Sequence, residues 1–208
     1  MSEQDRPQDA GAALERLLEG NARFVADRKL NPGNDSGRRA ELVAAQAPFA
    51  MVLGCADSRV PPEVVFDQGL GDLFVVRVAG NTAAVDAVLG SVEFSLAKLD
   101  CPLVVVLGHE GCAAVAGAVE VASGADREPG SIGAAIEPIV PVAESIRARE
   151  PGIERDALVG RCIRENVAAV AAGLAERSEI VAARVTAGDA RVVGAVYRLG
   201  SGEVELLQ

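Results

Sequence analysis

Two short polar segments of this chain carry residue types that bind metal ions and move protons. The first contains Cys55, Asp57 and Arg59, and the second contains His109 and Cys112. His109 is the only histidine of the chain. Each segment directly follows an apolar run, so we expect both to lie where a buried strand opens into a loop. In open α/β sheets, functional sites form at that edge.

Cys55, His109 and Cys112 form a donor set for a metal ion. The spacing of three residues between His109 and Cys112 lets both side chains converge on one ion at a strand-to-helix turn. Cys55 can reach the same ion from another strand that ends at the same edge. Two thiolates and one imidazole suit Zn²⁺, and three protein ligands with an open fourth position are typical of catalytic zinc. We therefore expect one Zn²⁺ per chain.

Asp57 and Arg59 are the candidate catalytic residues. In extended chain, side chains two residues apart point the same way. Beside a metal ion, Arg59 can hold Asp57 ionised and oriented, and Asp57 can accept a hydrogen bond from metal-bound water. Without a metal ion, the pair has a second interpretation as a surface salt bridge, which contributes little to stability.

Cys101 and Cys162 are expected to be small core residues. Cys101 precedes Pro102 at the opposite end of its strand, and Cys162 lies within a helical pattern, so neither is placed to complete a metal shell. A lone buried cysteine usually behaves as a small apolar residue.

The apolar pattern predicts one α/β domain over residues 1–208. Short β-prone runs occur at 49–53, 73–78, 103–107 and 191–197. Three of them lack alternation and indicate strands that are buried on both faces. A helix over 82–99, capped by Asn81 or Thr82, joins the second and third runs, and such a crossover requires parallel strands.

Further helical patterns cover about 10–28, 139–147, 156–172 and 178–187. The first is an amphipathic arm that the loop at 31–37 separates from the rest, so it can reach away from its own domain. The stretch 123–151 is rich in Gly, Pro and charge, and we expect a loop with one short helix there.

The composition narrows the function classes. The chain has 20 Lys or Arg against 30 Asp or Glu, a net charge of -10, which disfavours nucleic acids and anionic membranes as partners. A small or neutral ligand is the better expectation. No apolar run resembles an export signal or a spanning helix, so we expect a soluble cytoplasmic protein whose cysteines form no disulfides.

Three motifs together resemble the β-class carbonic anhydrases. They are CADSRV at 55–60, GLGDLFVVRVAGN at 69–81 and GHEGC at 108–112. The resemblance extends from the first helix to the terminal strand. It implies that Cys55, His109 and Cys112 bind zinc and that Asp57 and Arg59 form the catalytic dyad. It also implies a four-stranded, mostly parallel sheet flanked by helices, and a homodimer or homotetramer in which the N-terminal helix packs on a partner subunit.

The activity that the resemblance implies is reversible hydration of CO₂ to bicarbonate and a proton by zinc-bound hydroxide. Some members also bind bicarbonate at a non-catalytic site built from Trp, Arg and Tyr. Arg77 and Tyr197 match that site, but Val52 occupies the Trp position and the chain has no Trp, so we do not expect it here. Because His109 is assigned to the metal, no histidine remains as a proton shuttle.

Three alternatives stay open at this stage. The same site could hydrolyse the linear CO₂ analogues carbonyl sulfide or carbon disulfide. If Asp57 swings onto the fourth zinc position, the protein could be a catalytically silent zinc or bicarbonate-binding protein. The third alternative is a thiol-nucleophile or redox protein that uses Cys55 with His109, and bound zinc would exclude it.

Overall fold

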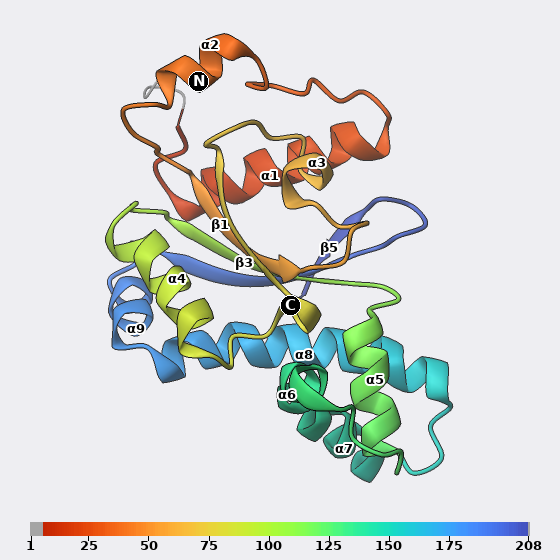
Figure 1. Cartoon of the computed structure of the whole chain (residues 1–208). Helices are drawn as coiled ribbons and strands as arrows, with labels where there is room; N and C mark the ends of the chain where they lie inside the picture. The colour runs from red at the N-terminus through yellow and green to blue at the C-terminus, as the bar shows by residue number, and fades with distance from the viewer. Residues whose placement is uncertain (1–5, 208) are drawn as a thin grey trace.

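The computed structural model describes residues 6–207, and a five-stranded sheet forms the centre of this part of the chain (Figure 1). The strands are β1 (Ala50–Cys55), β2 (Leu73–Val78), β3 (Leu103–His109), β4 (Arg191–Tyr197) and β5 (Val204–Leu206). Their order is β2-β1-β3-β4-β5; the first four pair in parallel and β5 pairs antiparallel with β4. The predicted α/β class is confirmed. The short β5 adds a fifth strand to the expected four.

The two central strands, β1 and β3, are buried along their whole length. They form continuous apolar runs because helices cover both faces of the sheet. The edge strand β2 is half-buried at every position. The buried centre therefore fixes the carboxyl ends of β1 and β3, where Cys55 and His109 lie.

Helices cover the two faces of the sheet unequally (Figure 1). Helices α1 (Ala10–Val25) and α3 (Pro62–Val65) pack on one face. The opposite face carries α4 (Asp86–Ala97), α5 (Ala113–Ala122), α7 (Val140–Arg149), α8 (Arg155–Arg177) and α9 (Glu179–Thr186). The remaining helical segments are α2 (Ser36–Glu41), α6 (Gly130–Ile136) and the 3₁₀ turns η2 (Ala79–Asn81) and η3 (Glu137–Ile139). None of the helices within residues 6–207 combines the length and the apolar character that crossing a membrane requires.

The N-terminal arm packs on the sheet of its own chain. Ala13, Leu14 and Leu17 of α1 are buried in the same apolar cluster as Phe49 and Phe66. The helix ends at Val25, short of the predicted boundary at residue 28. Packing of this helix on a partner subunit stays a prediction.

The structure corrects the predictions for the segments 82–99 and 123–151. The helix that was expected over 82–99 spans only Asp86–Ala97, and its N-cap is Val85. Neither Asn81 nor Thr82 caps it: Asn81 belongs to η2 with a φ of 47°, and Thr82 is extended. The segment 123–151 contains α6 as well as α7, in place of one short helix. The residues of α6, mainly Gly, Ala and Ile, provide no polar face that would mark a helix in the sequence.

Candidate metal centre

The parallel sheet brings the three candidate ligands to one edge. Strands β1 and β3 are neighbours, with Gly54 opposite Leu107, so their carboxyl ends open side by side. Cys55 is the last residue of β1 and His109 is the last residue of β3. Cys112 follows one turn later as the N-cap of α5. Topology therefore joins ligands that are far apart in the sequence.

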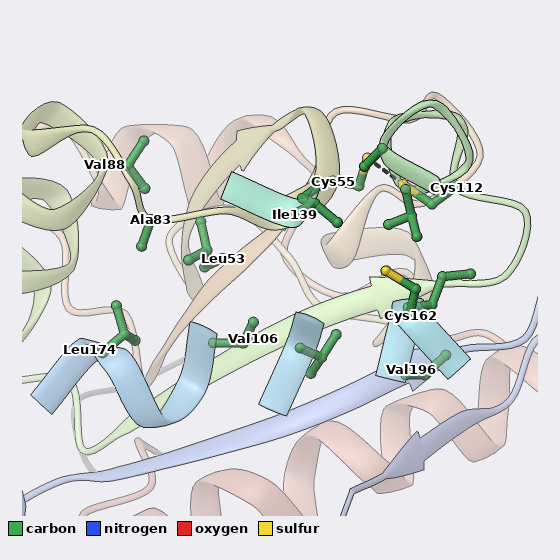
Figure 2. Packing of buried hydrophobic residues seen from close by; sticks show 14 of the residues in the cluster. Leu53, Cys55, Ala83, Val88, Val106, Cys112, Ile139, Cys162, Leu174 and Val196 are labelled. Atoms are coloured by element: carbon green, nitrogen blue, oxygen red, sulfur yellow. Dashed lines mark hydrogen bonds between the residues drawn. The ribbon is translucent and has the colours of Figure 1, made fainter. Parts of the chain in front are cut away.

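The ligand atoms of Cys55, His109 and Cys112 all lie within 4.8 Å of one another. The two Sγ atoms are 3.9 Å apart, and Figure 2 shows both sulfurs pointing toward each other. All three side chains are buried. The Nδ1 atom of His109 hydrogen-bonds the carbonyl oxygen of Glu110 at 2.8 Å. This contact favours the tautomer in which Nε2 carries the free lone pair.

The residues present fit a zinc ion. Two sulfurs bound tetrahedrally at the usual Zn–S distance are separated by about 3.8 Å, close to the separation of Cys55 and Cys112. The Nε2 atom of His109 is buried and has no hydrogen-bond partner within residues 6–207. A buried polar atom without a partner costs free energy, and a cation would remove that cost. Within the same residues, this is the one set of three such side chains whose ligand atoms converge.

The electrostatics of the thiol pair also favour a cation. The hydrogen bond with Cys112 lowers the pKa of Cys55 and burial opposes this. The His109 side chain, and then the backbone N–H groups of Asp57 and Gly80, lower the pKa further. The same contact raises the pKa of Cys112, because a second thiolate would form beside the first. A divalent cation between the sulfurs removes this repulsion and allows both thiols to ionise.

Asp57 and Arg59 form the ion pair that the sequence predicted. Arg59 Nε and Nη2 donate to the two carboxylate oxygens of Asp57 at 2.9 and 2.7 Å. The Arg59 guanidinium holds the pKa of Asp57 well below its usual range, against the effect of partial burial. Arg59 Nη2 also donates to Gly111 O at 3.3 Å, and Asp57 Oδ2 lies 4.0 Å from His109 Nε2. The pair therefore lies beside the candidate ligands.

Arg77 has a structural role that sequence reasoning missed. Its Nε donates to the carbonyl oxygen of Cys55 at 2.9 Å, and its Nη2 donates to the carbonyl oxygen of Asp57. The guanidinium thus holds the backbone of the loop that carries one ligand and the carboxylate. The resemblance had connected Arg77 only with a bicarbonate site. At the Trp position of that bicarbonate site this chain has Val52, whose buried side chain offers no hydrogen-bond donor.

The other two cysteines lie outside the centre, as predicted. Cys101 is buried, and its thiol donates to Pro48 O at 3.4 Å. Cys162 is buried on α8, and Figure 2 shows its sulfur apart from the pair formed by Cys55 and Cys112.

Comparison with known proteins agrees with the geometry. Residues 50–204 match the family model for carbonic anhydrase. A carbonic anhydrase of Mycolicibacterium smegmatis is 42% identical over 94% of this chain and 92% of its own length. Carbonic anhydrase 2 of Mycobacterium tuberculosis is 41% identical over 94% of this chain and 91% of its own length. The structure of a Coccomyxa β-carbonic anhydrase in complex with acetazolamide superposes with a TM-score of 0.75 at 28% identity, over 93% of this chain and 86% of that chain.

A mostly parallel sheet with a Cys-His-Cys cluster at its carboxyl edge defines a class of α/β metalloproteins. Within that class, the chain belongs to the carbonic anhydrase family and to its β-class. The resemblance that three short motifs indicated is confirmed over nearly the whole chain.

Proposed function

We propose that this chain is a zinc enzyme that catalyses the reversible hydration of CO₂ to bicarbonate and a proton. The observation that carries the proposal is the buried cluster of Cys55, His109 and Cys112, with the Asp57 carboxylate 4.0 Å from His109 Nε2. When bound there, zinc acts as a Lewis acid and makes hydroxide available near neutral pH. The similarity to relatives named carbonic anhydrase supports the same activity.

In this proposal Asp57 orients the attacking oxygen. An ionised carboxylate is only an acceptor, so it fixes the position of the hydrogen and turns the lone pair of the oxygen toward the carbon of CO₂. Arg59 binds both carboxylate oxygens, so Asp57 would stay paired with the guanidinium and would not itself bind the metal ion. Arg77 holds the backbone of Cys55 and Asp57, so that ligand and carboxylate keep a fixed relation.

The donor set predicts how the rate depends on pH and buffer. Two thiolates cancel more of the charge of a divalent ion than three neutral imidazoles do, so we expect activity to rise above pH 7. The only imidazole, that of His109, is a ligand, and no second histidine is present to carry protons to solvent. Turnover should therefore increase with the concentration of external buffer.

The test is stopped-flow hydration of CO₂ by the zinc-loaded protein between about pH 7 and 9. The Asp57→Asn variant keeps the size of the side chain and removes its charge. We expect its kcat to fall by about 100-fold. Its zinc content should stay at that of the wild type.

The control variant is Asp156→Asn. Asp156 also pairs with an arginine, Arg155, but on the exposed surface of α8. Its rate should match that of the wild type. A zinc-replete wild type without CO₂ hydration contradicts the proposal and directs attention to carbonyl sulfide, carbon disulfide or a permanently closed site.

We also propose that the enzyme is a homodimer or a homotetramer. Within residues 6–207, the outer strand β2 pairs with β1 alone, and such edges favour pairing with another chain. Beside it Phe94 is 48% exposed and stacks on Phe74, with ring centroids 6.1 Å apart. Light scattering at micromolar concentration tests this proposal, and a monomer would contradict it.

Two further proposals concern organisation and location. We propose that residues 1–208 form one domain, because both apolar clusters pack on the same sheet. We propose a cytoplasmic location, because all four cysteines are free thiols, as a reducing compartment favours. Limited proteolysis and cell fractionation test these two statements.

A further inference from the structure

Asn21 is a buried polar residue within helix α1, the N-terminal arm. Asparagine is unfavourable inside a helix, because its amide competes for backbone hydrogen bonds. Here the side chain bonds distant backbone groups instead. Nδ2 donates to Val65 O at 3.1 Å and to Gly202 O at 2.8 Å, and Oδ1 accepts from Val204 N at 2.9 Å. Asn21 therefore joins the end of α3 to the turn between β4 and β5.

The neighbouring Gly20 lets α1 approach α3 closely enough for these hydrogen bonds, and Figure 1 shows the two helices beside each other. A Cβ at Gly20 would overlap the carbonyl oxygen of Phe66, the residue that follows α3. Backbone therefore packs on backbone here, and such close packing leaves the Asn21 side chain little freedom to move.

Helix α3 continues the loop that carries Asp57 and Arg59. Asp57 O accepts from Val60 N at 3.1 Å, and Pro61 O accepts from Val65 N at 3.0 Å. Val60 and Val65 are both buried in the apolar cluster that includes α1. A shift of Val65 is therefore passed on to the loop, because close-packed groups move together.

The turn between β4 and β5 is connected to the segment that follows β3. Arg198 O accepts from Gly202 N at 2.8 Å, which closes the turn. At the start of this turn, Tyr197 O accepts from Glu110 N at 3.0 Å. The position of Gly111, the next residue, therefore depends on where the turn lies.

The two segments that Asn21 joins meet a second time at the ion pair. Arg59 Nη2 donates to Gly111 O at 3.3 Å, and the Arg59 side chain is 53% exposed. A long and exposed hydrogen bond contributes little to stability, so it does not by itself fix the separation of the two segments. The buried hydrogen bonds of Asn21 are better suited to do so, because leaving their partners unpaired would cost free energy.

We propose that Asn21 is a positioning residue for the pair of Asp57 and Arg59. Its amide holds α3 and the β4–β5 turn together, so that the Arg59 guanidinium reaches both the Asp57 carboxylate and Gly111 O. The proposal rests on the proposed function, in which this pair orients the attacking oxygen. It gives the N-terminal arm a role within its own subunit.

The first test is the kcat of CO₂ hydration by zinc-loaded Asn21→Leu. Leucine has a similar volume and no polar group, so the backbone groups that Asn21 binds lose their partner. We expect kcat to fall by about 10-fold with unchanged zinc content, because the ion pair loses its fixed geometry. The matched control is Leu17→Ala, one turn earlier on the same buried face of α1, which removes packing but no hydrogen bond. Its kcat should stay within about twofold of the wild type.

The second test observes Arg59 without using the activity. In ¹⁵N-labelled protein the Arg59 Nε–H group gives a side-chain NMR signal, which is assigned by its loss in Arg59→Lys. The hydrogen bond of this group to Asp57 slows the exchange of its proton with solvent. We expect exchange to be at least about threefold faster in Asn21→Leu and unchanged in Leu17→Ala. Asn21→Ala takes the place of Asn21→Leu if the latter does not fold.

The outcomes separate this inference from the proposed function. A zinc-replete wild type without CO₂ hydration contradicts the zinc enzyme, and the exchange of Arg59 Nε–H then decides the inference by itself. Equal exchange rates in the wild type and in a folded Asn21 variant overturn the inference alone. It is also overturned if Asn21→Leu and Leu17→Ala have kcat values within about twofold of each other.

Discussion

Four buried thiols in this chain lie in two different environments. Cys55 and Cys112 face each other at the carboxyl edge of the sheet, with their sulfurs 3.9 Å apart, and nearby backbone N–H groups lower the pKa of each thiol. Cys101 and Cys162 are equally buried, but burial raises the pKa of each to about 12. The first pair is suited to bind a cation, whereas the second pair stays protonated.

Burial alone therefore does not make a cysteine a metal ligand. The thiols at the metal centre lie at a strand end and at a helix start, where the backbone has N–H groups without other partners. Cys162 lies within a helix, whose backbone groups are already paired. Convergence on His109 then completes the donor set.

The largest expected effect comes from removing a thiol at the metal centre. Cys112→Ala leaves two ligands, so we expect both zinc affinity and kcat/KM for CO₂ hydration to fall by more than about 100-fold. Cys101→Ala should keep one zinc per chain. Metal analysis after dialysis against a chelator measures both. Equal zinc loss in the two variants would refute the distinction between the two environments.

We expect a smaller effect from a substitution at Arg77, because it leaves all three candidate ligands in place. Arg77→Met removes the donors that hold the carbonyl groups of Cys55 and Asp57. We expect kcat/KM to fall by about 10-fold with full zinc content, because the loop loses its fixed geometry. Arg155→Met, at an exposed ion pair with Glu120, is the control and should keep the wild-type rate. An unchanged Arg77→Met would show that the ligands alone fix the loop.

The smallest effect concerns stability at high pH. The unfolded thiols of Cys101 and Cys162 ionise near pH 9, whereas the folded ones stay protonated to about pH 12. The folded state thus binds more protons in this interval, and its stability falls as the pH rises, by at most about 1.4 kcal/mol per pH unit for each thiol. Urea unfolding of Cys101→Ala between pH 8.5 and 10.5 should show a shallower decline than the wild type. Identical slopes would contradict the assignment of this thiol as a protonated core group.

The site could be predicted from the sequence because its residue types are rare and its order along the chain is regular. The only histidine of the chain, His109, lies three residues before Cys112 and follows an apolar run, and Cys55 follows another apolar run. This pattern predicted that both groups of candidate ligands lie at strand ends. The ion pair of Asp57 and Arg59 was expected from their separation by two residues. The strands at 73–78 and 191–197 were predicted at their observed bounds, since apolar runs are their strongest signal.

The contacts that hold the site could not be predicted. Arg77 acts through the backbone carbonyl groups of Cys55 and Asp57, and such contacts depend on how neighbouring strands pack. A helix was expected after Cys112, but the extent of α5 could not be predicted, because Ala, Val and Gly without polar alternation give no helical period. The N-cap of α4 was misplaced because Asn81, a residue type that favours caps, is used for its tolerance of a left-handed backbone.

The neighbouring positions of β1 and β3 have a consequence for how the protein matures. Cys55 leaves the ribosome 54 residues before His109, and β2 and α4 lie between them. Parallel pairing of distant strands is slow, so the three ligands meet only late in folding. We therefore expect metal loading to follow folding, so that zinc present during refolding leaves the refolding rate unchanged. A cell that is short of zinc would hold folded apoprotein that is ready to be loaded.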